Sequence, residues 1–239
     1  IVDSLVGSEM CIRDRFMLDI SYAGEGVATS QKHTTNFNGL YYGFEIGYSN
    51  ANANAYSHTD LVDADYGEFV YNTDPYGYLA GLNLGYNIKV SPSMLIGVEL
   101  GYDDRMSASD QGSNNGVHFN TVTVKNSIDI ISKIGYLLNE STLLYTVGGY
   151  QGTDVESTFH RPAINTTQTS TTRRGGYTLG LGLEREVSDS MTYKFEYRHS
   201  KSNNLKEDFT TGLNCGLSDC WEDQYFDEHT LRLGVNFYF

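Results

Sequence analysis

From residue 40 onward, the chain repeats stretches in which apolar and polar residues alternate, joined by connections that are alternately very short and long. A period of two places successive side chains on opposite faces of a β-strand. We predict strands over residues 40–49, 77–89, 94–104, 122–138, 142–152, 175–186, 191–200 and 227–239. Most are close to the roughly 9 to 11 residues that cross a lipid bilayer as a tilted strand.

The connections predict how these strands are arranged. Three are tight turns, VSPS, NES and VSDS, and four are long polar segments, residues 51–76, 105–121, 153–174 and 201–226. Tight turns on one side and long loops on the other are typical of barrels in the outer membrane of Gram-negative bacteria. We therefore predict an all-β fold: an eight-stranded antiparallel up-and-down transmembrane β-barrel with three short periplasmic turns and four long extracellular loops.

The outward face of the predicted strands suits lipid. Aromatic residues fall near the long loops at Tyr48, Tyr78, Tyr102, Tyr177 and Tyr197, and near the short turns at Tyr86, Tyr136, Tyr145, Tyr193 and Phe237. Two aromatic girdles with aliphatic residues between them mark the two water interfaces of a membrane barrel. A soluble lipocalin-like barrel has the same number of strands but does not account for this face.

Composition excludes two other classes of protein. Only 39% of the residues are hydrophobic, and no apolar run approaches the roughly 20 residues of a membrane-spanning helix. The net charge of −14 argues against nucleic-acid binding, which depends on cationic contacts with phosphates.

The beginning of the chain stands apart from this pattern. Residues 1–15 fit nothing that follows and resemble a translated sequencing-adapter stretch, so we interpret them as a non-native artefact. Residues 16–36 are interpreted as a signal-peptide remnant and lead-in, since Ser21 and Ala23 supply the small residues of a cleavage site. The outer-membrane barrel domain is expected over residues 37–239.

Charged residues occupy inward positions of the predicted strands. They are the acids Glu45, Glu99, Asp129, Glu184 and Glu196 and the bases Lys125, Lys133, Lys194, Arg198 and Arg232. An eight-stranded barrel has an interior just large enough for side chains to fill it, and buried charges need partners to offset their desolvation. We predict a structural ion-pair network, with Arg232 near Glu45, and little or no steady conductance. A minor, porin-like channel for small solutes is the alternative.

Two segments carry a resemblance to a known family. Residues 175–200 contain a glycine-alternating strand, a short Asp-containing turn and then Lys194, Glu196, Tyr197 and Arg198, and the chain ends in LRLGVNFYF. Together with FNGLYYGFEIGYS near the start, they resemble the opacity-type outer-membrane β-barrel domain family. The resemblance implies a surface protein with a role in envelope integrity, adhesion or host interaction, and no shared catalytic residues.

The end of the chain also resembles the assembly signal of outer-membrane barrels. A strand that finishes on Phe239 is expected to be recognised by the barrel-assembly machinery and to pair with the first strand. We expect a monomer, surrounded by outer-membrane lipids and lipopolysaccharide.

A lipid A-modifying hydrolase is a further alternative, because residues 198–203, RHSKSN, are similar to a run in lipid A deacylases. In that run the serine follows the histidine by two positions, which places both on one face of a strand. Here neither Ser200 nor Ser202 shares a face with His199. We therefore expect no catalytic residue and no enzyme activity.

The long connections contain the remaining candidate sites. Cys215 and Cys220 are interpreted as a disulfide, because two thiols alone make an incomplete metal site. Arg105, Arg173, Arg174 and Lys201 are either lipopolysaccharide phosphate contacts or ordinary charges that solvate the rim. Tyr66, Tyr71, Trp221 and Tyr225 are candidate anchors for a surface ligand. We expect no metal site and no cofactor.

Overall fold

The computed structural model describes residues 37–59, 69–106, 108–114, 118–161, 165–202, 205–208 and 220–239. Their secondary structure is β-strand throughout: β1 (Gly39–Thr59), β2 (Phe69–Thr73), β3 (Tyr76–Ser91), β4 (Met94–Met106), β5 (Ala108–Asn114), β6 (His118–Asn139), β7 (Thr142–Arg161), β8 (Thr166–Ser188), β9 (Met191–Ser202), β10 (Leu205–Asp208) and β11 (Cys220–Tyr238). None of the described residues forms a helix long and apolar enough to cross a membrane.

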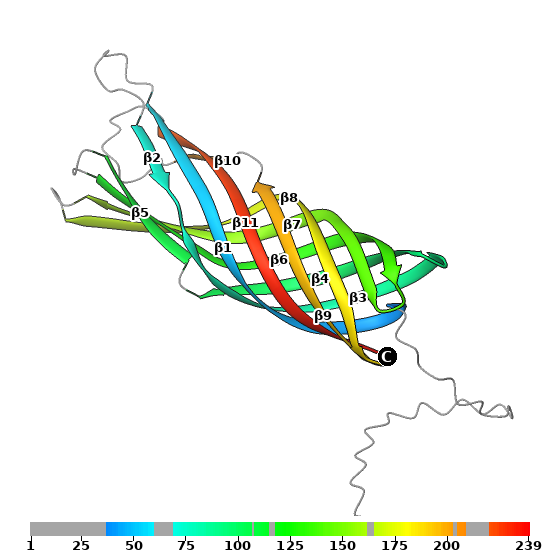
Figure 1. The fold of residues 1–239 in the computed structure, drawn as a ribbon. Helices are drawn as coiled ribbons and strands as arrows, with labels where there is room; N and C mark the ends of the chain where they lie inside the picture. Colours follow the sequence, from blue (N-terminus) through cyan, green and yellow to red (C-terminus); the bar gives the residue numbers. More distant parts are fainter. Residues whose placement is uncertain are drawn as a thin grey trace, which may run out of the picture. The chain divides into compact units, whose positions relative to one another are not determined.

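Eight of these strands close into a barrel (Figure 1). The hydrogen-bonded order is β1, β3, β4, β6, β7, β8, β9 and β11, and β11 returns to pair with β1. All pairings are antiparallel, and the closing pair runs from Tyr41 opposite Tyr238 to Thr59 opposite Cys220. The backbone N–H of Phe239 donates to the carbonyl oxygen of Leu40 at 3.1 Å. The predicted eight-stranded antiparallel barrel and its closure by the C-terminal strand are confirmed.

Several strands run well beyond their predicted ends. β2, β5 and β10 pair with the outer parts of β1, β6 and β11, and β7 and β8 stay paired up to Arg161 opposite Thr166. Much of residues 51–76, 105–121, 153–174 and 201–226, predicted as loops, is therefore strand. The backbone ladder continues there because Thr-rich segments favour extended structure, while water on the outside removes the apolar alternation that marks a membrane strand.

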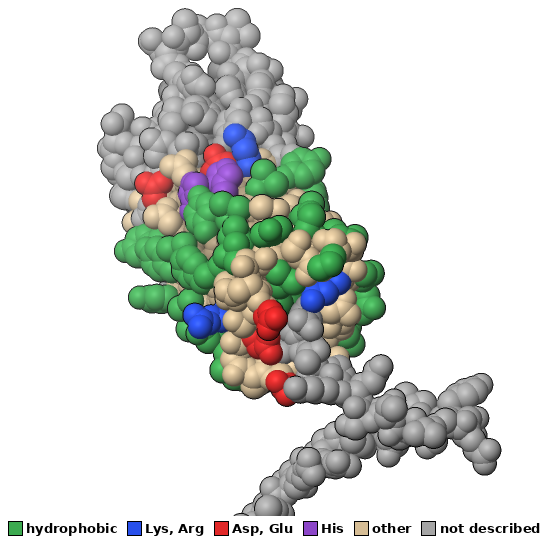
Figure 2. Space-filling view, turned by 45° about the vertical axis from the view of Figure 1, so that its right-hand side comes forward, with side chains coloured by type: hydrophobic (Ala, Val, Ile, Leu, Met, Phe, Trp, Pro, Cys, Tyr) green, Lys and Arg blue, Asp and Glu red, His purple; other side chains and the backbone are tan. Residues whose placement is uncertain are grey.

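The barrel wall has an apolar outer face (Figure 2). Large exposed hydrophobic side chains on it include Phe44, Ile46, Leu82, Val98, Ile130, Leu181, Phe195 and Leu233. Tyr145 does not belong to this face, which corrects the predicted girdle: it is 1% exposed and points into the barrel. Its cross-strand neighbours, Gly135 and Gly182, have no side chain and leave room for its ring.

The interior is layered along the barrel. An apolar cluster that includes Phe37, Leu95, Leu143, Tyr145 and Tyr238 lies toward the short turns. A second cluster of Ala51, Val122, Val124, Val155 and Phe226 lies within the extended part of the wall. The buried charges occupy the space between these two clusters, so apolar packing borders them on both sides.

Candidate functional site

The inward face of six strands supplies the charged residues of the interior. β1 contributes Glu45, β4 Glu99, β6 Asp129 and Lys133, β8 Glu184, β9 Lys194, Glu196 and Arg198, and β11 Arg232. All are at most 5% exposed. Alternation along each strand aims these side chains inward, because the residues on either side of each face the lipid.

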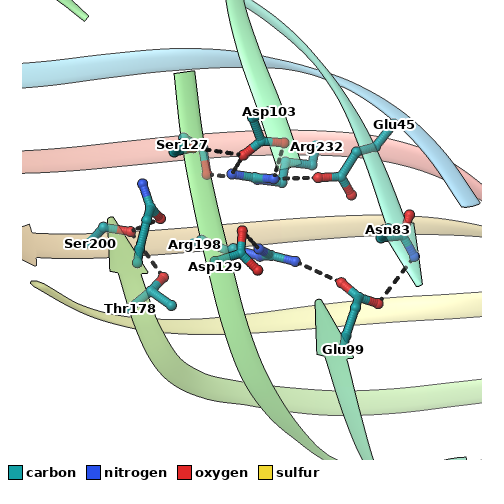
Figure 3. A network of polar contacts seen from close by, with 12 residues as sticks. Glu45, Asn83, Glu99, Asp103, Ser127, Asp129, Thr178, Arg198, Ser200 and Arg232 are labelled. Atoms are coloured by element: carbon teal, nitrogen blue, oxygen red, sulfur yellow. Dashed lines mark hydrogen bonds and ion pairs between the residues drawn. The ribbon is translucent and has the colours of Figure 1, made fainter. Parts of the chain in front are cut away.

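Arg232 joins the first strands of the barrel to the last. Its guanidinium donates to both carboxylate oxygens of Asp103, at 2.9 and 2.7 Å, and to Glu45. Figure 3 shows the Arg232 side chain lying between these two acids. This is a bidentate arrangement plus a third bond, the geometry for which a planar guanidinium is suited.

Arg198 makes a second set of bonds in the same layer. Its Nη1 and Nη2 atoms lie 3.1 Å from Asp129 and 3.1 Å from Glu99 (Figure 3). Its Nε donates to Glu196. Glu99 also accepts a 2.7 Å hydrogen bond from the Tyr41 hydroxyl. One guanidinium thus holds acids from β4, β6 and β9 together.

Two lysines connect these arginine sets. Lys194 Nζ lies 3.0 Å from Glu45 and 3.4 Å from Glu99, so it bridges the partners of Arg232 and Arg198. Lys133 Nζ lies 3.7 Å from Glu99 and 3.5 Å from Glu184. It also lies 4.5 Å above the centre of the Tyr145 ring, a cation–π distance. The predicted residues form one connected network.

Glu184 extends the network toward the short turns. One of its oxygens accepts hydrogen bonds from Thr192 at 2.5 Å, Asn236 at 2.9 Å and Tyr238 at 2.9 Å. Two of these donors belong to the C-terminal strand β11, so this buried acid helps hold the closing strand to β8 and β9.

Four further charged residues belong to the interior: Asp103, Arg105, Arg174 and Glu228. Asp103 binds Arg232, and Arg105 Nη2 lies 2.8 Å from Glu228. Glu228 also accepts from the Ser49 hydroxyl at 2.5 Å and from Gln151 at 3.2 Å. Strand alternation could have identified Asp103 and Glu228 as well. Asp103 follows outward-facing Tyr102, and Glu228 precedes inward-facing Thr230 by two positions.

Two of the cations expected at the outer rim lie inside the barrel instead. Arg105 is 7% exposed and Arg174 is 3% exposed. Each continues the inward series of a strand that extends past its predicted end, which is why the expected lipopolysaccharide contact does not apply to them. The prediction that Lys125 faces inward is also wrong. A bulge between Val124 and Ser127 interrupts the alternation, and Lys125 pairs with Glu156 at 2.6 Å outside the buried network.

The interior charges nearly balance. Among the buried charged side chains of the described residues, seven are acids and six are bases. Pairing of this kind offsets the cost of desolvation in a closed space. Arg105, Lys133, Lys194, Arg198 and Arg232 each pair with a carboxylate of another strand, so the arrangement holds strands together.

The remaining two rim cations do lie outside. Arg173 donates to both oxygens of Asp154, at 2.7 and 2.9 Å, and this partner raises the pKa of the guanidinium. Lys201 is exposed on β9. Lys201 therefore stays a candidate lipid contact, and it lies opposite Asp227 of β11.

His199 and its neighbouring serines lie on opposite faces of β9. Ser200 is buried inside the barrel, and its hydroxyl lies 2.9 Å from Oε1 of Gln151 and 2.9 Å from the hydroxyl of Thr178; Figure 3 shows Ser200 beside Thr178. His199 packs on the outer face, its ring centre 4.6 Å from that of His229. Within the part of the chain that the structure describes, no three His, Cys, Asp or Glu residues are grouped to hold a metal ion.

Other candidates lie outside what the structure describes. Cys215 and Tyr66 fall in residues 209–219 and 60–68, and the side chains of Cys220, Tyr71, Trp221 and Tyr225 are likewise not among those described. The proposed disulfide and loop anchors therefore stay predictions.

Comparison with known proteins agrees with this geometry. A family model described as the outer membrane protein beta-barrel domain matches residues 9–239. The 31 kDa outer-membrane immunogenic protein of Brucella melitensis biotype 1 is 23% identical over 213 residues, 86% of this chain and 85% of that protein.

Solved structures share the fold. The outer membrane protein OprG from Pseudomonas aeruginosa gives a TM-score of 0.50 at 12% identity, over 84% of this chain and 95% of that one. The outer membrane protease OmpT from Escherichia coli gives 0.51 at 10% identity, over 84% of this chain and 97% of that one. At such identities the likeness concerns the fold alone.

Proposed function

Because this chain belongs to the outer membrane protein beta-barrel domain family, we propose that it is a monomeric, non-enzymatic surface protein of the outer membrane. In this proposal the filled barrel is an anchor. The paired strands and loops beyond the membrane act in adhesion or in contact with a host or surface, and the barrel itself contributes to envelope integrity.

The extended part of the wall is the observation that carries this proposal. β7 and β8 remain paired for eleven residues on each strand beyond Tyr150 and Tyr177, which face each other in the exposed aromatic layer. The apolar cluster of Val122, Val124, Val155 and Phe226 packs inside this extension. A ladder with its own packed interior is a stiff support, suited to presenting loops at a fixed distance from the membrane.

Two further observations support the absence of catalysis and of an open pore. His199 and Ser200 face opposite sides of the wall, so the pair does not form a nucleophile and base. The side chains of Lys133, Lys194, Glu99 and Glu184 have 0% exposure, which leaves little space for a water-filled path between them.

Shortening the β7–β8 hairpin tests the role of the extension. Residues 157–170 are replaced by Asn-Gly, so that Glu156 and Thr171, which face each other, flank a two-residue turn. We expect cells that display this variant to lose most of the adhesion conferred by the wild-type protein to epithelial cells or to extracellular matrix.

The matched control changes the opposite end of the barrel. Replacing Asp189 and Ser190, in the short turn between β8 and β9, with Asn-Gly leaves the extension intact and is expected to leave adhesion unchanged. Surface labelling and the mobility of unheated protein on SDS gels report that each variant is folded and displayed. Equal adhesion by wild-type and non-expressing cells would refute the adhesion role.

A further inference from the structure

A groove crosses the lipid-facing wall over strands β6 to β9. It has a volume of about 550 Å³ and is lined by Ser132, Ile134, Thr146, Val147, Gly148, Leu179, Gly180, Leu181, Tyr197 and His199. This volume is within the roughly 300–1,000 Å³ range of small-molecule sites.

The groove has a simple origin in two rows of cross-strand neighbours. Ser132, Gly148, Leu179 and His199 lie opposite one another in one row, and Ile134, Thr146, Leu181 and Tyr197 in the next. Small side chains at positions 132, 146 and 148 form the floor. The walls are large, since Ile134, Leu179 and Leu181 are each more than half exposed to the surroundings of the barrel.

The surroundings indicate what fills it. The groove opens onto the band of exposed aliphatic and aromatic side chains that faces the membrane hydrocarbon. A hydrocarbon chain is the one occupant that is present at this depth at high concentration and matches an apolar lining.

Polar groups gather at the end of the groove nearer the loops. His199 packs against His229 with ring centres 4.6 Å apart, and the Tyr197 hydroxyl lies 2.7 Å from Nδ1 of His229. We assign the hydroxyl as donor, which places the proton of His229 on Nε2. Nδ1 of His199 is buried and has no hydrogen-bond partner among the described residues.

A lysine completes this polar end. Lys201 follows His199 by two positions, on the same face of β9 and about 7 Å further along the strand. Asp227 lies opposite Lys201 on β11, and Asn50 lies opposite His229 on β1. Imidazole and ammonium donors suit a phosphate group, and the apolar groove below them suits an acyl chain. The loop end of the barrel faces the outer leaflet of the membrane.

We propose that the groove and the pair His199–His229 hold one molecule of lipid A, with an acyl chain along Ser132, Thr146 and Gly148 and a phosphate at His199, His229 and Lys201. This inference rests on the outer-membrane location of the barrel and is independent of what the loops bind. The phosphate contact expected of Arg105 and Arg174, which lie inside the barrel, is assigned here to His199, His229 and Lys201 on the outer face.

Filling the groove is the direct test. A Cβ atom at Gly148 would lie 3.2 Å from Cδ2 of Leu179, the mobile end of a side chain, and would meet no other atom within 4 Å. Gly148→Leu therefore projects into the groove without disturbing the wall. Ala80→Leu, on the outer face of β3 away from the groove, is the matched control.

Native mass spectrometry measures retained lipid on full-length protein released from vesicles that contain bisphosphorylated lipid A and phosphatidylglycerol. We expect wild type and Ala80→Leu to retain one lipid A, and Gly148→Leu to retain it roughly tenfold less. His199→Ala/His229→Ala is expected to lose the preference for lipid A over its dephosphorylated form while still retaining an acylated lipid.

Three results would overturn the proposal. They are equal lipid A retention by Gly148→Leu and wild type, equal retention of phosphatidylglycerol and lipid A by wild type, and an unchanged phosphate preference after the histidine substitutions. The gel mobility of unheated samples establishes folding, and Thr146→Leu fills the same groove if Gly148→Leu does not fold.

Discussion

Arg232 shows how a single side chain links distant parts of this chain. It binds Asp103 of β4 and Glu45 of β1 from the last strand, and it is 1% exposed. Because the three residues come from three different strands, the guanidinium both neutralises the two acids and links β11 to β1 and β4 through the interior.

Removing the guanidinium of Arg232 is expected to destabilise the barrel strongly. Arg232→Ala leaves Asp103 without its bidentate partner and Glu45 with only Lys194, and breaking a buried pair in this way costs about 3–5 kcal/mol. Urea unfolding in lipid vesicles, followed by tryptophan fluorescence or gel mobility, measures the loss. The stability of Arg232→Lys should lie between those of wild type and Arg232→Ala, because lysine keeps the positive charge but cannot form the bidentate guanidinium contact.

The exposed pair of Arg173 and Asp154 provides the control for charge removal. Arg173 makes similar bidentate contacts in water, where screening and side-chain entropy cancel most of the attraction. Arg173→Ala is expected to unfold at the same urea concentration as wild type. An equal effect of both substitutions would mean that burial of the network does not matter.

Two glycines shape the apolar layer near the short turns. The Tyr145 ring lies where a Cβ of Gly182 would be, and the Tyr41 ring lies where a Cβ of Gly85 would be. Any side chain at these positions must displace a buried aromatic ring from its place beside the charged network.

We therefore expect Gly182→Leu to be poorly tolerated. Overpacking of this kind typically costs about 1–3 kcal/mol, and displacing Tyr145 would also remove the closer of the two ring contacts of Lys133, leaving the one with Tyr41. Gly152→Leu is the comparison, since a Cβ there lies 3.6 Å from its nearest neighbour, Arg173. The yield of folded protein after refolding into detergent separates the two; equal yields would contradict the packing described here.

At the scale of strands, the sequence predicted the membrane part of the barrel and not the part above it. Within the membrane, lipid outside and charge inside force strict alternation, so the strand order, the closing pair and the inward residues Glu45, Glu99, Lys194 and Arg232 are readable. Beyond the membrane both faces are polar or mixed, and the period of two disappears although the ladder continues.

The interior could be predicted only as far as that alternation held. Tyr145 was misread because its aromatic character suggested the lipid interface, while the deciding factor was the space above Gly135 and Gly182 on neighbouring strands. Arg105 and Arg174 each lie one residue outside a predicted strand, 94–104 and 175–186, so the sequence pattern places them at the rim although β4 and β8 continue through them. Which acid meets which base depends on register across the barrel, which no single strand reveals.

A disulfide trap tests the extension of β7 and β8. Thr158 and Thr169 lie opposite each other, with their hydroxyl oxygens 3.1 Å apart. In a background with Cys11, Cys215 and Cys220 changed to Ser, we expect Thr158→Cys/Thr169→Cys to cross-link nearly completely under mild oxidation, as measured by intact mass with thiol labelling.

The control for the trap shifts the register by one residue. Ser170 points to the other side of its strand from Thr169, so Thr158→Cys/Ser170→Cys should keep free thiols. Efficient cross-linking of both pairs, or of neither, would mean that this segment is a mobile loop. The paired extension of β7 and β8, on which the proposed function depends, would then not exist.

At the scale of the whole molecule, the barrel combines a lipid-facing wall with an interior that is packed rather than open. The two apolar clusters border a nearly neutral layer of buried charges. In such a structure the barrel holds the extended strands in place.

The central claim is that this interior is closed by paired charges, and conductance across a planar lipid bilayer tests it most directly. Purified full-length protein, reconstituted at a density confirmed by labelling, is recorded in 1 M salt (about 3 Å Debye length) and in low salt. We predict no steady, stepwise current above the bare membrane in either condition. Reproducible, long-lived channel openings from the folded protein would contradict the account and favour a solute channel.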